Sequence, residues 1–110
     1  MAGYFEIKTR ADGSYWFNLK ASNHQVILIS EAYASKSACL NGVTSVKKNC
    51  LDDLRYLRKT SKDGSAYFVL TGANGEVVGR SEMYSTASAM EIGIASVKAN
   101  APAAPAKDLA

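Results

Sequence analysis

The sequence of 110 residues has few of the residues that hold small secreted domains or fibrous chains together, with only two cysteines and two prolines. Two cysteines cannot build the disulfide framework of a secreted domain, and two prolines exclude collagen-like and proline-rich chains. No apolar run approaches the roughly 20 residues of a membrane-spanning helix. The first residues turn polar without the apolar stretch of a secretory signal. We therefore expect a cytoplasmic protein with reduced thiols and no membrane segment.

Strong charge of either sign is also missing. Charged residues make up 21% of the chain and hydrophobic residues 47%, and the formal net charge is +3. This composition is typical of a soluble globular protein. A chain of this length buries roughly two-thirds of its unfolded surface when it folds. We therefore expect residues 1–110 to form a single domain.

The most informative pattern is an internal repeat with a period of 51 residues. When the chain is shifted by 51 positions, 19 of the 46 residues from 5 to 50 are identical to their counterparts, without a gap. The identities include Asp12-Gly13-Ser14 with Asp63-Gly64-Ser65, Ser30-Glu31 with Ser81-Glu82, and Gly42 with Gly93. Such self-similarity indicates a duplicated structural unit. Repeat 1 covers about 4–50 and repeat 2 about 55–101, followed by a C-terminal tail at 102–110.

Each repeat is predicted to form three strands and a helix. In repeat 1, apolar and polar residues alternate over 5–8 and 15–20, and the β-branched segment 26–29 indicates a third, mostly buried strand. Asp-Gly and Asn-Gly pairs supply the turn chemistry between strands. The helix is predicted to begin at Ser35, whose hydroxyl can cap it, and to end near Asn49. Glycines on the apolar stripe of both helices indicate close packing of helix against sheet.

These segments resemble the YegP-like family of small bacterial and archaeal proteins of unassigned function. The resemblance is carried by Phe5-Glu6-Ile7-Lys8, the Asp-Gly turn, Tyr15-x-Phe17-x-Leu19-Lys20-Ala21-x-Asn23, Ser30-Glu31-x-Tyr33-x-Ser35-Lys36 and Asn41-Gly42-x-x-Ser45-Val46-Lys47-Lys48-Asn49. It implies an α+β fold in which two tandem β-β-β-α(-β) repeats form a single, pseudo-two-fold symmetric antiparallel sheet with both helices on one face. The last strand of each unit is expected to cross to the other unit, giving eight strands. The resemblance implies no activity.

Few residues are suited to metal binding or nucleophilic catalysis. The single histidine, His24, aligns with Gly75 at a predicted turn, so this position needs no side chain. Cys39 aligns with Met90, and Cys50 aligns with Ala101, as expected of thiols that act as small hydrophobic residues. No zinc-ligand spacing is present, and one histidine in a turn is a poor general base. We therefore expect no metal site, no cofactor, no catalytic residue and no enzymatic activity.

Two carboxylates keep an alternative open. Glu31 and Glu82 are the only glutamates that the repeats share, and paired carboxylates can serve as acid and base. The alternative function is therefore a small-metabolite-binding protein or an enzyme with a site at the pseudo-two-fold between the repeats. A deep polar pocket that holds one of these glutamates beside a lysine would favour it.

The favoured function is a non-enzymatic binding or interaction module that uses the face of the sheet left uncovered by the helices. Strand alternation sends Trp16 and Tyr67 to that face, together with Lys8, Lys20 and Lys59. Aromatic rings and lysines are the side chains that stack bases and attract phosphates. Single-stranded nucleic acid is the leading ligand, with a peptide strand or another protein as alternatives, or these rings only complete cross-strand pairs on a wet surface.

Assembly follows from the duplication. Because one chain carries both units, it is expected to be a monomer in which the pseudo-two-fold replaces a dimer axis. By symmetry with the segment after the first helix, residues 106–109 are predicted to add a short edge strand. The prolines of the tail fit an edge, where a missing N–H is tolerated.

Overall fold

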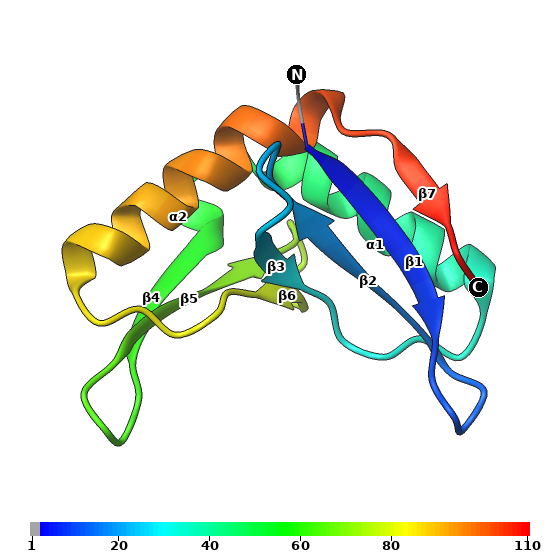
Figure 1. The fold of residues 1–110 in the computed structure, drawn as a ribbon, viewed down its shortest axis with the longest axis horizontal. Helices are drawn as coiled ribbons and strands as arrows, with labels where there is room; N and C mark the ends of the chain where they lie inside the picture. The colour runs from blue at the N-terminus through cyan, green and yellow to red at the C-terminus, as the bar shows by residue number, and fades with distance from the viewer. Residues whose placement is uncertain (1–2) are drawn as a thin grey trace.

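The alternating segments of the sequence form the strands of one sheet (Figure 1). The computed structural model describes residues 3–110. Its strands are β1 (Tyr4–Thr9), β2 (Tyr15–Lys20), β3 (Val26–Ile29), β4 (Tyr56–Thr60), β5 (Ala66–Thr71), β6 (Val77–Arg80) and β7 (Ala106–Asp108). Its helices are α1 (Lys36–Asn49) and α2 (Ala87–Asn100), which are followed by the short 3-10 turns η1 (Asp53–Arg55) and η2 (Ala101–Ala103).

The sheet has the order β4-β5-β6-β3-β2-β1-β7, so the two repeats meet at its centre. The predicted α+β class, with both helices on one face, is confirmed. The sheet has seven strands instead of the expected eight because the chain after α1 continues directly as β4. This strand is therefore both the strand that crosses from repeat 1 and the first strand of repeat 2. The pairing of β7 with β1 is parallel, whereas the other strand pairs of the sheet are antiparallel.

The turns follow from residues that accept a left-handed backbone. Gly13 and Gly64 have φ angles of 85° and 88°, and Gly75 has a φ of 82°. His24, the counterpart of Gly75, adopts the same region with a φ of 68°. Side chains with a β-carbon rarely adopt this region. The single histidine therefore occupies a turn position whose backbone conformation glycine adopts more easily.

Both helices begin at hydroxyl caps and bury one stripe. The side chain of Ser35 accepts a hydrogen bond from the N–H of Ala38, and that of Thr86 accepts one from Ala89. These bonds satisfy N–H groups that have no partner within the helix. The buried residues are Cys39, Gly42, Val43 and Val46 in α1, and Met90, Gly93, Ile94 and Val97 in α2.

The repeats interlock through their helices. Helix α1 contacts β2 of its own repeat and β6 of the other, while α2 contacts β5 and β3. The direct strand contact is narrow, because β3 and β6 share the single register pair Ile29–Arg80. On either side of this pair the β1–β2 and β4–β5 hairpins spread apart like the legs of an arch (Figure 1). Neither repeat completes its core without the other.

Candidate binding face opposite the helices

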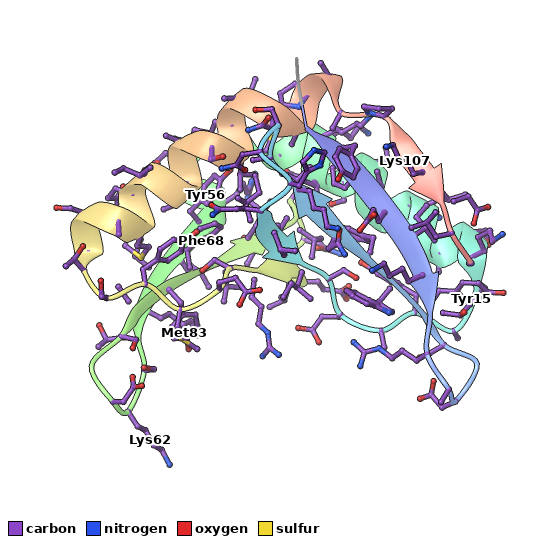
Figure 2. The ribbon with its side chains drawn as sticks, viewed as in Figure 1. Tyr15, Tyr56, Lys62, Phe68, Met83 and Lys107 are labelled. Atoms are coloured by element: carbon purple, nitrogen blue, oxygen red, sulfur yellow. The ribbon has the colours of Figure 1, made fainter. Side chains whose placement is uncertain are left out.

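The two faces of the sheet differ because side chains alternate along each strand. Phe17 and Leu19 of β2, and Phe68 and Leu70 of β5, are completely buried in the core beneath the helices. Figure 2 shows Phe68 and Tyr56 close together below α2, with their ring centroids 5.6 Å apart. The residues between them point the other way. We call that side the helix-free face, defined by Glu6, Lys8, Trp16, Asn18, Lys20, Ile29, Leu57, Lys59, Tyr67, Val69 and Arg80.

Each half of the helix-free face carries one lysine beside one aromatic ring. Lys8 lies opposite Trp16 in the β1–β2 register, and Lys59 lies opposite Tyr67 in the β4–β5 register. Both rings are half-buried. The Lys8 ammonium is 5.6 Å from the centre of the Trp16 ring, within the range of a cation–π contact. The duplication thus places two register pairs of a lysine and an aromatic residue on the same face, and the cation–π contact is formed by Lys8 and Trp16.

Arg10 is a second cation beside Trp16 that the sequence analysis missed. Its guanidinium carbon lies 5.5 Å from the centre of the Trp16 ring. The counterpart of Arg10 in repeat 2 is Ser61, so the two aromatic sites are not equal in charge. A position just beyond a strand end gives no sequence signal of this contact.

Lys20 differs from the other predicted lysines because it is held in an ion pair. Its ammonium nitrogen is 2.9 Å from Glu6 Oε1, and the Lys8 nitrogen is 3.7 Å from the same oxygen. Burial raises the pKa of Glu6, but the attraction of Lys20 and Lys8 outweighs it and holds this pKa below its ordinary value. The bond to Glu6 raises the pKa of Lys20. Part of the positive charge predicted for this face is therefore neutralised within it.

Arg80 lies at the centre of the helix-free face and was also missed. It pairs with Ile29 across the junction of the repeats and with Val69 on its other side. Its side chain is exposed, and within residues 3–110 it forms no salt bridge. The sequence did contain a signal, namely a difference between the repeats. The 51-residue shift aligns the charged Arg80 with the apolar Ile29.

The centre of the helix-free face is less open than the sequence indicates. Asn18 is only 2% exposed and Val69 only 8%, although alternation directs both away from the helices. Cross-strand neighbours flank them, with Glu6 and Ile29 on either side of Asn18. The Oδ1 atom of Asn18 is buried and has no hydrogen-bond partner among the described residues. The accessible groups are therefore the two aromatic pairs, Arg80 and the exposed Leu57.

Comparison with known proteins identifies the family. A family described as a domain of unknown function (DUF1508) matches the chain twice, over residues 11–56 and 61–108. The protein belongs to this family. Each DUF1508 match starts in the turn or strand end before β2 or β5, and ends in β4 or β7. The second match includes all of β7, whereas the first reaches only Tyr56, the first residue of β4. The two matches agree with the duplicated architecture.

Relatives of the DUF1508 chain span nearly its whole length. A UPF0339 protein of Bordetella pertussis is 58% identical over 109 residues, covering 98% of this chain and 96% of that protein. The UPF0339 protein YegP of Escherichia coli is 45% identical over 108 residues and 98% of each chain. These matches confirm the YegP-like resemblance. The names of these relatives state no activity.

Solved structures of the family share the fold. The solution NMR structure of YegP from E. coli, a protein of unknown function, matches with a TM-score of 0.94 at 45% identity, over 99% of this chain and 94% of YegP. The solution NMR structure of a UPF0339 protein from Shewanella oneidensis has a TM-score of 0.94 at 39% identity, covering 99% and 92%. No function is established for this family by these relatives.

The two cysteines of this DUF1508 protein are packed in its core, and its histidine contacts a neighbouring tyrosine. Cys39 and Cys50 are buried in the core, and burial raises the pKa of both thiols. The Nδ1 atom of His24 is 2.7 Å from the hydroxyl of Tyr4. Over residues 3–110, no group of three His, Cys, Asp or Glu side chains is placed to hold a metal ion. In that same range, no helix has the length and apolar character to cross a membrane.

The shared Ser-Glu-x-Tyr segments form hydrogen bonds at the ends of β3 and β6. The hydroxyl of Ser30 accepts a hydrogen bond from the Phe17 N–H and donates one to the Glu31 carbonyl. Ser81 makes the same two bonds, with Phe68 and Glu82. The carboxylates of Glu31 and Glu82 are on exposed residues. The surface cavity lined by Asn41, Lys48 and Asn74 contains neither of them.

Proposed function

We propose that this protein is a non-enzymatic binding module that holds single-stranded nucleic acid on its helix-free face. The observation that carries the proposal is the repeated cross-strand pair of a lysine and an aromatic residue, Lys8 with Trp16 and Lys59 with Tyr67. Stacking of a base on an accessible aromatic ring contributes about 1–3 kcal/mol and requires no particular base. Lysines beside the rings add attraction to the phosphates.

The charges of the helix-free face support an anionic ligand. Arg10 and Arg80 add two cations to the lysines, and Glu6 is the acidic residue of this face. The formal net charge of +3 is small, so long-range attraction is weak. Binding should therefore be of modest affinity and strongly dependent on salt.

The distance between the two aromatic sites favours an extended ligand. Three interstrand spacings of about 4.8 Å, or about 14 Å in total, separate Asn18 of β2 from Val69 of β5. Trp16 and Tyr67 lie two residues from these positions in opposite directions, so their rings are farther apart than this. A single nucleotide cannot contact both rings. A short oligonucleotide that crosses the junction at Arg80 can do so.

A peptide is a weaker candidate because peptides that join a sheet bind along an edge strand. The outer edge of β1 is already covered by β7, so the edges left for such a peptide are those of β4 and β7. The helix-free face offers side chains and not unpaired backbone groups. We propose in addition that the protein acts as a monomer, since one chain carries both halves of the fold. We also propose that it acts in the cytoplasm, the location expected from the sequence.

The proposal is tested by fluorescence anisotropy with a labelled, mixed-sequence, single-stranded oligonucleotide. Replacing Trp16 or Tyr67 with alanine should weaken binding about tenfold each, in line with the loss of one stacked base. Lys59→Ala should weaken binding more than Lys62→Ala, because Lys62 lies at the tip of the β4–β5 hairpin, away from this face (Figure 2). Raising salt from about 50 to about 200 mM should reduce affinity about tenfold.

Glu6 provides a sharper variant. Glu6→Gln removes the carboxylate that neutralises Lys20 and should strengthen oligonucleotide binding severalfold. The proposal fails if neither aromatic substitution weakens binding, or if Glu6→Gln weakens it in a variant that remains folded. Saturable binding of a peptide with no binding of the oligonucleotide would replace nucleic acid with a protein ligand.

A further inference from the structure

An open surface cavity that is separate from the helix-free face and carries several polar side chains lies between the two repeats. Its volume is about 390 Å³, and it is formed by residues 41–49 of α1 and by the turn that joins β5 to β6. Polar lining residues are Asn41, Thr44, Ser45, Lys48, Asn49 and Asn74. Cavities of this size and with convergent polar groups are typical sites for small molecules.

The duplication provides an internal comparison for this cavity. The counterparts of Asn41, Thr44 and Lys48 on α2 are Ile92, Ala95 and Ala99. The polar groups are therefore not required by the helix or by its packing on the sheet. They are features of one repeat.

The counterpart of Asn49 also shows what this position can bind. Asn49 and Asn100 each donate from Nδ2 to a carbonyl one turn earlier, at 2.8 Å in both cases. The Oδ1 atom of Asn100 accepts a hydrogen bond from the backbone N–H of Gly3, at 2.8 Å. Within residues 3–110, Oδ1 of Asn49 has no such partner, and Asn49 lines the cavity. The backbone of Gly3 thus occupies the side-chain acceptor of Asn100, whereas the equivalent acceptor of Asn49 is available to a ligand.

The turn between β5 and β6 contributes a hydrogen-bond donor, and its glycine leaves room for a ligand. Oδ1 of Asn74 accepts from the N–H of Glu76, so its Nδ2 group remains as a donor. A β-carbon on Gly72 would lie 3.2 Å from the Ser45 hydroxyl and 3.3 Å from Asn74 Oδ1, which is a crowded position. Glycine therefore keeps the approach between Ser45 and Asn74 open.

The charge of the cavity limits its ligand. Lys48 is its single cation and, among the described residues, forms no salt bridge. The cavity lies near the C-terminal end of α1, where the helix dipole contributes partial negative charge. One ammonium group against this background suits one carboxylate and not a doubly charged phosphate. The amides and hydroxyls offer both donors and acceptors, as hydroxyl groups of a sugar require.

We propose that this cavity binds a monosaccharide acid, a small polyol with one carboxylate. The carboxylate lies at Lys48, and the hydroxyl groups contact Asn41, Asn49 and Asn74. The proposal does not rest on nucleic-acid binding, because the cavity shares no residue with the helix-free face. It corresponds in class to the metabolite-binding alternative, but at a site without Glu31 or Glu82.

The test is an NMR titration of the intact protein with glucuronate, with glucose and inorganic phosphate as comparison ligands. Glucuronate should shift the backbone amides of residues 41–49 and 72–75 in a saturable manner, with a Kd in the millimolar range. Glucose should bind the same residues about threefold to fivefold more weakly, which is the contribution of one exposed ion pair. Phosphate should bind more weakly than glucuronate.

Variants separate the cavity from general charge effects. Lys48→Ala should reduce affinity for glucuronate about threefold to fivefold without changing that for glucose. Asn41→Ile should weaken both sugars, and its counterpart Ile92 shows that the fold accepts this side chain. Lys47→Ala is the control, since Lys47 lies over the Phe5 ring and does not line the cavity. The proposal is overturned if no saturable shifts occur, if they map to the helix-free face, or if phosphate binds more tightly.

Discussion

The phenolic oxygen of Tyr33 occupies the space that a side chain on Gly42 would need, and the Tyr33 Cζ atom lies 2.7 Å from the position of such a β-carbon. Tyr84 and Gly93 have the same relationship in repeat 2, also with 2.7 Å to Cζ. The shared glycines therefore admit a tyrosine from the segment that enters each helix. The sequence indicates close packing at these glycines, but not that a tyrosine ring is the partner.

Gly42→Ala tests this contact. Alanine favours a helix over glycine by about 1 kcal/mol, but the added methyl group overlaps the Tyr33 ring, and overpacking costs about 1–3 kcal/mol. We expect a net loss of about 1 kcal/mol in the free energy of unfolding, measured with urea. Thr44→Ala, on the exposed side of α1, should change it by less than about 0.5 kcal/mol. A stabilised Gly42→Ala protein would show that helix propensity alone governs this position.

Stability in acid should depend on Asp53. Hydrogen bonds from Arg58 and Lys98, at 2.9 and 3.0 Å, lower the pKa of Asp53 to about 2. A carboxyl whose pKa is lower in the folded state stabilises the protein above its unfolded pKa near 3.8 and loses this contribution as pH falls toward 2. Asp53→Asn should therefore reduce the free energy of unfolding at neutral pH and flatten its decline between about pH 4 and about pH 2. An equal decline in variant and parent protein would contradict this role.

The half-chain ending at Asn49 should not fold as a stable monomer. It retains β1 to β3 and α1, but it loses β6, which both β3 and α1 contact. The buried stripe of α1 would then be partly exposed, so the fragment should unfold or associate with itself. Sedimentation velocity and a two-dimensional NMR spectrum distinguish these outcomes. A dispersed spectrum from a monomeric fragment would contradict the interlocked sheet.

Local chemistry and the repeat were sufficient to predict much of the fold. The Asp-Gly turns, the caps at Ser35 and Thr86, and the placement of Trp16 and Tyr67 depend on neighbouring residues or on strand alternation. These features follow from sequence because their causes lie within a few positions of each other. The repeat also indicates a strand after each helix, and the short connection after Asn49 explains why β4 serves both repeats.

Contacts between distant strands could not be predicted. The ion pair of Glu6 with Lys20 depends on the β1–β2 register, and the central position of Arg80 depends on pairing between repeats. The burial of Asn18 depends on side chains of neighbouring strands. The cavity near Lys48 combines a helix of one repeat with a turn of the other. Each of these features requires the register of the assembled sheet, which alternation within one strand does not contain.

The measurement that most directly tests binding at the helix-free face is an NMR titration of the intact protein with a mixed-sequence, single-stranded oligonucleotide at low salt. We expect shifts that saturate and cluster on β1, β2, β4 and β5, with the Trp16 indole signal among the largest, and with both repeats affected. The same titration of Trp16→Ala should retain the shifts around Tyr67 at reduced affinity. Shifts that are absent, or that lie on α1 and α2 instead, would contradict the assignment of this face as the binding surface.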